Sequence, residues 1–479
     1  MSMSSRAATR RQVLARTGAL GAGIAFTGAV SELFAGTAAA QPLGHTGYGP
    51  LVPDPDGLLD LPRGFSYRVL SREGDELRSG EGKVPSNHDG MSAFPARSNH
   101  SGRPDRPGHS GRSSGRHAHT LLVRNHENRE DGRVPVPTVE GLTYDPEGKG
   151  GCTALELDSR NHVLSERVGI AGTAVNCAGG HTPWNTWLTC EETEDRAGTN
   201  GYTKDHGFIF EVDPVDPHRT GAVPLTAMGR FQHEAIAVDP RRGVVYETED
   251  AFERPFGLFY RFLPEKPLGG TGSLRAGGRL QAMRVPGVPD LSSIQETGAC
   301  FDGIEWVDVP DPLAAETPIR FQDFGRGGIT HAQKLEGCYW GGHSVYFVSS
   351  FAHSDEGSAA DHYGQIWRYD PERRRLTLVI VFGPDTDVQL PGESPDNICL
   401  APSGGLMVCE DGNGAQHVFG LTRRGEVYAM ARGAQNIGTE EEPQWGEFAG
   451  VTFSPDGDTM YVNCYTPGTT FAVTGPWRR

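Results

Sequence analysis

Positive charge is scarce in this chain of 479 residues. Its 44 Lys and Arg stand against 61 Asp and Glu, which leaves a formal net charge of -17 at pH 7. This balance argues against a nucleic-acid-binding protein, because phosphate contacts need Lys and Arg clustered on one face. It does not argue against a phosphate substrate, since surplus carboxylates can hold hard cations that present positive charge to an anion. Solubility alone also accounts for an acidic surface.

Signature motifs of nucleotide-binding loops and zinc proteases are missing as well. The chain has no GxxxxGK[ST] loop, no GxGxxG after an expected strand and no HExxH motif. His233 and Glu234 begin like HExxH, but Ala237 stands where the second His would be. Asp54–Gly57 (DPDG) begins like a calcium loop and lacks the remaining ligands. The sequence therefore gives no support to these classes of protein.

Cysteine is sparse, and no two of the eight cysteines form a CxxC pair. Zinc-ribbon spacing is therefore absent. So few cysteines in a large chain do not make a disulfide scaffold, and either small buried thiols or one or two bridges account for most of them. The eight are Cys152, Cys177, Cys190, Cys300, Cys338, Cys399, Cys409 and Cys464.

No apolar run after residue 40 reaches the roughly 18 to 20 residues of a membrane-spanning helix. Residues 1–40 are typical of a leader. Thr9–Leu14 (TRRQVL) is a twin-arginine pattern, a weakly apolar stretch follows from Leu20 to Val30, and Ala38–Ala40 is a cleavage signal. We expect export of the folded protein by the twin-arginine machinery, no stable membrane insertion, and a periplasmic or extracellular location.

Turn-forming residues, in contrast, are plentiful: 65 Gly and 34 Pro make up about a fifth of the chain. Between them lie short apolar runs, often with period two, which indicate strands and hairpins. One hairpin type, with a Pro turn, recurs at Ala237–Pro240, Leu400–Gly404 and Phe453–Gly457. Such recurrence predicts radially repeated blades, and hence an all-β fold: a β-propeller with loop insertions, formed by residues 41–479 as a single domain.

The alternative fold is a pair of large β-sandwiches, and the uneven period leaves the number of blades open. Residues 96–119 are rich in Arg, Ser, Gly and His and have almost no apolar side chains. We expect a mobile surface loop there, because nothing in it can pack.

Carboxylates recur at the ends of the expected strands. In a propeller they could converge on the mouth of the central channel, where they would repel one another unless a cation neutralised them. Taken one by one, they are also typical of solvated loop acids. A thiol, Cys177, lies in a Gly-rich turn near two of them. The acids are Glu127, Glu191, Glu192, Glu234, Glu336, Glu410 and Asp411.

Five long segments, in this order, resemble the motifs of the PhoX family of exported alkaline phosphatases. The resemblance runs from about residue 50 to the C-terminus, and the twin-arginine leader also fits that family. The segments are NCAGGHTPWNTWLTCEET from Asn176, GRFQHEAIAVDP from Gly229, KLEGCYWGGHSVYFVSS from Lys334, ESPDNICLAPSGGLMVCEDG from Glu393 and FAGVTFSPDGDTMYVNCYTPGTTFAVTGPW from Phe448.

The resemblance implies a β-propeller whose central site holds two bridged ferric ions together with calcium ions. Cys177 then matches the iron-ligating thiolate, Glu192 a metal ligand, and Glu191 a neighbour in the same cluster. Hard Fe(III) and Ca(II) both take carboxylate oxygens. Further carboxylate ligands match Glu234, Glu336 and Asp411.

One residue departs from the family pattern. Lys334 stands where the R-x-EG motif has Arg, so the position keeps a positive charge but loses the bidentate fork. We expect Lys334 and Asn125 to bind phosphate while the metal cluster supplies nucleophile and charge, with no Ser or Thr nucleophile. The resemblance thus implies metal-dependent hydrolysis of small phosphoesters, and we expect a monomer.

Two other classes of function remain open at this point. A calcium-dependent propeller hydrolase, such as a lactonase or a phosphodiesterase, would share the calcium without needing the thiolate. A non-catalytic propeller would act as a binding module and turn nothing over. Fold alone does not separate these classes, because propellers host many functions.

Overall fold

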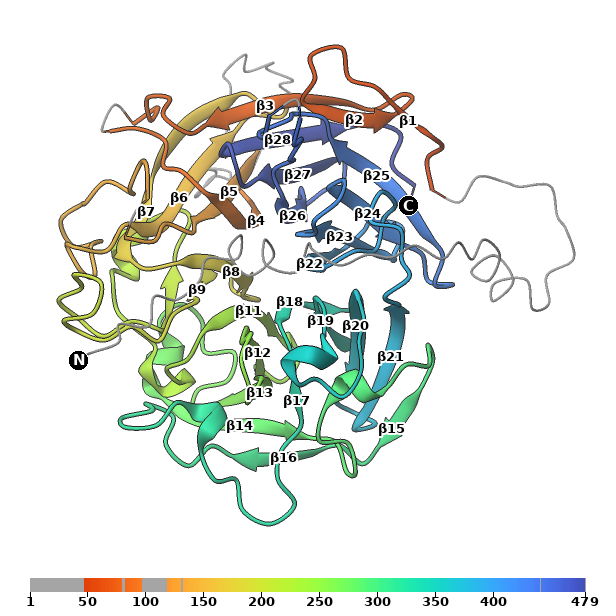
Figure 1. Cartoon of the computed structure of the whole chain (residues 1–479). Helices are drawn as coiled ribbons and strands as arrows, with labels where there is room; N and C mark the ends of the chain where they lie inside the picture. The colour runs from red at the N-terminus through yellow and green to blue at the C-terminus, as the bar shows by residue number, and fades with distance from the viewer. Residues whose placement is uncertain (1–46, 80–81, 97–118, 131, 440, 479) are drawn as a thin grey trace, which may run out of the picture. The chain divides into compact units, whose positions relative to one another are not determined.

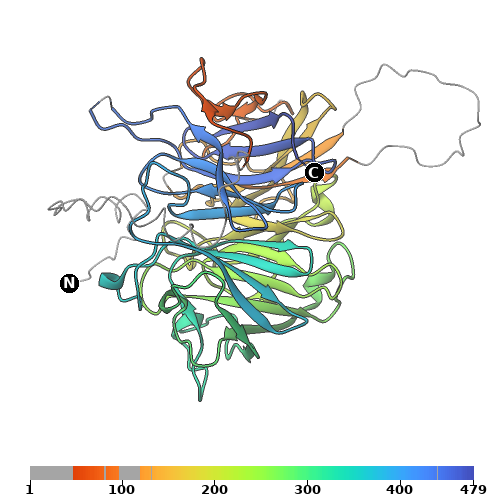
Figure 2. The same cartoon turned by 90° about the vertical axis from the view of Figure 1, so that its right-hand side faces the viewer.

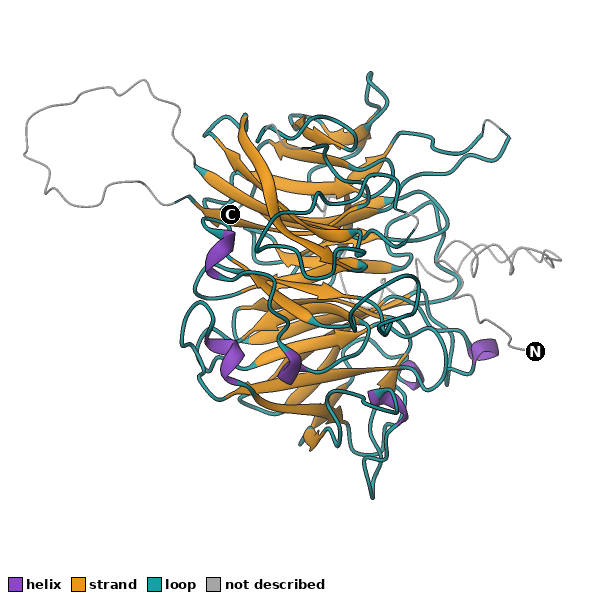
Figure 3. Ribbon diagram, turned by 90° about the vertical axis from the view of Figure 1, so that its left-hand side faces the viewer, coloured by secondary structure: helices purple, strands orange, loops and turns teal. Residues whose placement is uncertain are grey.

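The computed structural model describes residues 47–79, 82–96, 119–130, 132–439 and 441–478. The expected leader, residues 1–40, lies outside the described residues, and so does 97–118, nearly all of the expected mobile loop. Strands dominate the described part, and its helical segments are short 3-10 turns in the loops (Figure 3). None of these helices has the length and apolar character needed to cross a membrane. The turns are η1 (Pro217–Arg219), η2 (Thr226–Met228), η3 (Ser273–Ala276), η4 (Leu291–Ser293), η5 (Ile319–Phe321) and η6 (Ser354–Glu356).

Six antiparallel sheets stand around one axis, as blades of a propeller (Figure 1). Blade 1 contains β4 (His88–Pro95), β5 (Thr120–His126), β6 (Gly150–Leu157) and β7 (Val163–Thr173). Blade 2 contains β8 (Asn176–His181), β9 (Trp187–Glu191) and β10 (Ile209–Val212). Blade 3 contains β11 (His233–Val238), β12 (Val245–Glu249), β13 (Gly257–Pro264), β14 (Gly278–Arg284), β16 (Glu305–Asp308) and β17 (His331–Ala332).

Blades 4 to 6 complete the circle. Blade 4 contains β18 (Leu335–Gly341), β19 (Ser344–Ser349), β20 (Gly364–Asp370), β21 (Arg375–Phe382) and β15 (Cys300–Asp302). Blade 5 contains β22 (Pro395–Leu400), β23 (Leu406–Glu410), β24 (His417–Leu421), β25 (Val427–Gly433), β2 (Leu59–Pro62) and β1 (Leu51–Val52). Blade 6 contains β26 (Phe448–Phe453), β27 (Thr459–Cys464), β28 (Thr469–Thr474) and β3 (Ser66–Arg72).

The β-propeller expected from the sequence is confirmed, with six blades, and the β-sandwich alternative is wrong. Each recurring Pro turn joins the innermost strand of a blade to its second strand, at β11–β12, β22–β23 and β26–β27. The core lies between blades: Phe259 of blade 3, for example, stacks on Phe347 of blade 4 with ring centroids 4.1 Å apart. Figure 2 shows the strands of the blades side by side.

The two ends of the propeller chain share blades. Strand β3 pairs with β28 as the outermost strand of blade 6, with Val69 opposite Phe471. Strand β2 pairs with β25 at the outer edge of blade 5, with Leu59 opposite Gly433. N-terminal strands thereby cover the edges of C-terminal blades, which closes the circle and protects strand edges.

The six innermost strands, β4, β8, β11, β18, β22 and β26, contact one another around the axis. Each has a break in its pairing register near its start, typical of a β-bulge. A bulge re-aims side chains relative to a regular strand. Small residues allow the close packing here: a Cβ on Gly90 would lie 2.5 Å from Ala178 Cα, and one on Gly337 would lie 2.4 Å from the Asp396 carbonyl oxygen.

Candidate metal centre

Five of the six bulges carry a side chain with a metal-ligand atom at the same place, the second residue of the innermost strand. All five side chains are buried. In blade 6 the bulge contains Gly450 and Val451, which have no polar side chain. We call the five residues the bulge ring: Asp89, Cys177, Glu234, Glu336 and Asp396.

A second set of residues lies where the second strand of each blade ends. In all six blades, the N–H of this residue donates to the carbonyl of the residue just before the innermost strand, over 2.8 to 3.1 Å. This hydrogen bond recurs in every blade. It therefore fixes the end of the second strand beside the start of the innermost strand in the same way in all six blades. We call the second set the strand-end ring: Glu127, Glu192, Asp250, Ser350, Asp411 and Tyr465.

The rings bring ligand atoms together in two overlapping clusters. Cys177, Glu192 and Glu234 each offer an atom within 4.8 Å of the others, and so do Glu234, Glu336 and Asp396. Glu234 belongs to both clusters, which therefore join across four blades, from blade 2 to blade 5. No other group of three such residues within this distance occurs among the described residues.

The donor set fits metal cations. Crowding several buried carboxylates is unfavourable unless positive charge neutralises them. Glu336 Oε2 is buried and has no hydrogen-bond partner, as expected of an atom kept for another ligand. Oxygen donors suit hard cations, and the one thiolate suits iron.

Cys177 is a thiol in the absence of a cation. Burial raises its pKa well above the ordinary value, and the negative charges of Glu234 and Glu192 raise it further. Its Sγ donates to the carbonyl of His233 at 3.2 Å. A bound cation would reverse this preference, because metal binding favours the thiolate.

Lys334 places a buried positive charge beside the bulge ring. It precedes β18 with a φ of 49° and its side chain is 2% exposed. Its ammonium group donates to Glu336 Oε1 and lies 3.7 Å from Asp411 Oδ2. Asp411 itself is not part of either three-residue cluster, so the structure connects it to the centre through Lys334.

Glu191 lies away from the two clusters, although its neighbour Glu192 is part of one. Its carboxylate accepts from the N–H groups of Ala174, Gly207 and Phe208 at 2.9 to 3.0 Å. His206 Nδ1 lies 2.6 Å from Glu191 Oε1. Adjacent strand residues face opposite sides, so Glu191 stabilises the interior of blade 2 while Glu192 faces the axis.

Asn125 is also placed differently from the expected phosphate contact. Its Nδ2 donates to the carbonyls of Cys177 and Ala178, at 3.1 and 2.7 Å. Its Oδ1 accepts from Cys152, Trp187 and Thr189 at 2.8 to 3.0 Å. The amide is fully buried, and its hydrogen bonds tie it to the bulge that carries Cys177.

The sequence motifs did not identify Asp396 or Asp89 as metal ligands. A sequence pattern does identify them. In five innermost strands, the second residue can bind a metal and the third is small or an amide. The pairs are Asp-Gly, Cys-Ala, Glu-Ala, Glu-Gly and Asp-Asn. Aligning the starts of these strands finds both residues.

All eight cysteines lie in the described residues and none forms a disulfide.

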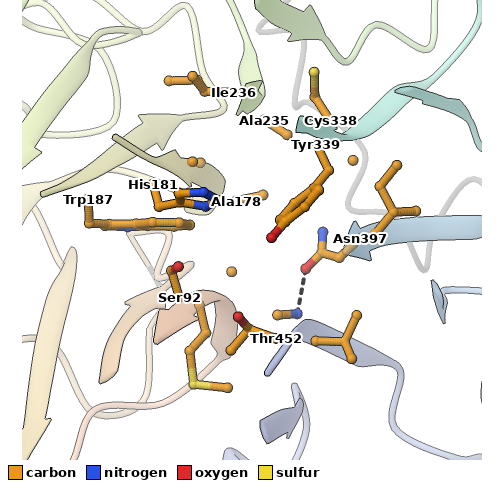
Figure 4. A pocket seen from close by; sticks show the side chains of 18 residues that line it. Ser92, Ala178, His181, Trp187, Ala235, Ile236, Cys338, Tyr339, Asn397 and Thr452 are labelled. Atoms are coloured by element: carbon orange, nitrogen blue, oxygen red, sulfur yellow. Dashed lines mark hydrogen bonds between the residues drawn. The ribbon is translucent and has the colours of Figure 1, made fainter. Parts of the chain in front are cut away.

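Next to the bulge ring, the axis opens into a narrow cavity of about 40 Å³ (Figure 4). Only innermost-strand residues and Trp187 of β9 line it, and His181, Tyr339 and Asn397 supply polar groups. Such a volume holds a few water molecules.

Comparison with known proteins shows the fold and the family of the chain. Pseudomonas fluorescens PhoX, solved with the transition-state analogue vanadate, is similar over 88% of this chain and 96% of its own, with 19% identity and a TM-score of 0.61. A gluconolactonase from Xanthomonas campestris covers 90% of this chain and 99% of its own, with 12% identity and a TM-score of 0.41. No curated protein matches. The family model described as alkaline phosphatase PhoX matches residues 46–468, and the chain therefore belongs to the PhoX family of alkaline phosphatases.

Proposed function

We propose that the chain hydrolyses phosphate monoesters at metal ions held by the bulge ring and the strand-end ring. Because the chain belongs to the PhoX family of alkaline phosphatases, its activity is the hydrolysis of phosphate esters. The observation that carries the location of the site is the pair of buried clusters that share Glu234. A site of this kind suits phosphoryl transfer, which needs positive charge around the phosphoryl oxygens more than it needs covalent chemistry from the protein.

The proposed metals are Fe(III) and Ca(II). Cys177, Glu192 and Glu234 would hold iron, since they include the only sulfur ligand of the two clusters. Glu234, Glu336 and Asp396 would hold calcium through oxygen atoms. Bound cations would supply positive charge to the phosphoryl oxygens and lower the pKa of water.

The protein's own groups have supporting roles. Lys334 would direct a buried positive charge at the phosphoryl group, while Glu336 and Asp411 hold its ammonium in place. Asn125 would position Cys177 through the backbone of the bulge. No Ser or Thr nucleophile is needed in this arrangement.

The phosphatase would act outside the cytoplasm as a monomer, on small phosphoesters. Its leader, with the twin-arginine pattern at Thr9–Leu14, supports export of the folded chain. Export after folding allows the buried centre to be loaded before the protein crosses the membrane.

Turnover of p-nitrophenyl phosphate tests the proposal, with metal analysis and visible absorption of the same sample. We expect turnover, iron and calcium in the wild type, and a ferric thiolate band that Cys177→Ser removes. Calcium alone with lactone turnover would favour a lactonase, and bound calcium without any turnover would favour a binding module. Full activity and full iron in Cys177→Ser would refute the role of Cys177.

A further inference from the structure

Arg129 lies against the strand-end ring in blade 1, two residues after Glu127. Its Nη2 is 2.9 Å from Glu127 Oε1 and 3.7 Å from Glu192 Oε2. The guanidinium therefore contacts one ring carboxylate and lies next to another, which belongs to the Cys177 cluster.

The exposure of Arg129 sets it apart from the charged groups around it. Its side chain is 33% exposed, whereas the side chains of Glu127 and Glu192 are 1% and 2% exposed. Lys334 is 2% exposed. Arg129 is thus a partly exposed cation, which a dissolved anion can meet while it approaches the buried carboxylates.

Arg129 and Lys334 come from blades on opposite sides of the propeller axis. Arg129 belongs to blade 1 and Lys334 to blade 4, and three blades of six separate opposite sides of the circle (Figure 1). Both lie beside ring carboxylates, Arg129 at Glu127 and Lys334 at Glu336. A tetrahedral anion bound over the centre would therefore have Arg129 on one side and Lys334 on the opposite side.

The two cations differ in what they can offer. A lysine ammonium is a point charge, and that of Lys334 is held by Glu336 and Asp411. A guanidinium is planar and can present two parallel N–H groups to two phosphate oxygens. The fork that position 334 lacks is therefore present on the other side of the centre.

We propose that Arg129 binds the phosphoryl group of the substrate, with its fork directed at two phosphoryl oxygens. The inference rests on the proposed function, because it assumes that the phosphoester binds over the two rings. It extends that function by assigning to Arg129 the bidentate recognition that Lys334 cannot provide.

Inhibition by inorganic phosphate tests this role, measured on the metal-loaded protein with p-nitrophenyl phosphate as substrate. The variants are Arg129→Gln and Arg129→Lys. The matched control is Arg133→Gln, because Arg133 also pairs with a carboxylate, Glu73, at 2.8 Å but does not lie at the rings. Iron, calcium and the visible absorption are measured on every sample.

We expect phosphate inhibition to weaken by roughly 10- to 100-fold in Arg129→Gln, with metals and absorption unchanged. Arg129→Lys should recover part of the affinity, and Arg133→Gln should match the wild type. Unchanged phosphate inhibition in Arg129→Gln would overturn the proposal. Loss of metals in Arg129→Gln would also overturn it, since Arg129 would then only position Glu127 and Glu192. A wild type without phosphatase activity would instead refute the proposed function.

Discussion

Glu234 and Glu336 occupy the same bulge position in neighbouring blades, and their carboxylate oxygens lie within 4.8 Å of each other. One repeated backbone irregularity thus brings two acids together from strands about one hundred residues apart in the chain. Without a cation, this proximity would be unfavourable. The candidate metal centre is therefore a property of the propeller repeat rather than of any single loop.

Glu234 contributes to both clusters, so its removal affects both metals. We expect Glu234→Gln to lower the affinity for iron and for calcium by more than about 100-fold, because even residues beside a ligand change metal affinity by roughly 10- to 100-fold. Metal titration of the purified variant measures this, with the exposed Glu372→Gln as control. Loss of one metal with retention of the other would show that Glu234 does not join the clusters.

Asn125→Ala removes an amide that makes five hydrogen bonds in the interior. Because several buried donors and acceptors lose their partner, we expect the free energy of unfolding to fall by about 3 kcal/mol. Urea denaturation measures this loss. A variant with unchanged stability and a raised KM would instead support the direct phosphate contact expected from the sequence.

Lys334→Met removes the buried ammonium between Glu336 and Asp411. We expect turnover to fall by roughly 100-fold, as is typical when one group that stabilises transition-state charge is lost. Lys334→Arg should change the phosphate inhibition constant, because it introduces a fork at this position. If Lys334→Arg leaves that constant unchanged, Lys334 does not contact the substrate. Lys83→Arg, at an exposed ion pair with Glu76, is the control.

His206 links blade stability to pH. Burial lowers the pKa of His206, but the carboxylates of Glu191 and Asp145 outweigh it, and the net shift is upward from the ordinary 6.5. A raised pKa in the folded state stabilises the protein below about pH 6.5, and this contribution is lost as pH rises through the folded-state pKa. We expect the difference in unfolding free energy between wild type and His206→Gln to be larger at pH 6 than at pH 9. Equal differences at both pH values would contradict the pairing.

Local patterns predicted much of the fold. The Pro turn at Ala237–Pro240 indicated a hairpin, and β11 and β12 form it. Patterns of this kind could not predict the closure of the propeller. The pairing of Leu59 with Gly433 joins residues far apart in the chain, and nothing in either segment specifies its partner.

The resemblance to the PhoX motifs pointed to Cys177, Glu234 and Glu336 as ligands, and the structure places these three residues at equivalent bulges of neighbouring blades. That they bind metal stays a prediction. The members of the site were not predictable where two neighbouring residues of one strand face opposite sides of the sheet. Glu191 and Glu192 are equally acidic in the sequence, yet only Glu192 reaches a cluster. The sequence also does not show that the Asn125 amide is fully engaged by backbone and side chains.

Elemental analysis of the purified wild-type protein, with p-nitrophenyl phosphate turnover of the same sample, tests the central claim most directly. The claim is that the two clusters sharing Glu234 hold the metals of a phosphatase. We predict bound iron and calcium in the active protein, and loss of turnover when a chelator removes them. Full turnover by a protein that contains neither metal would contradict the account.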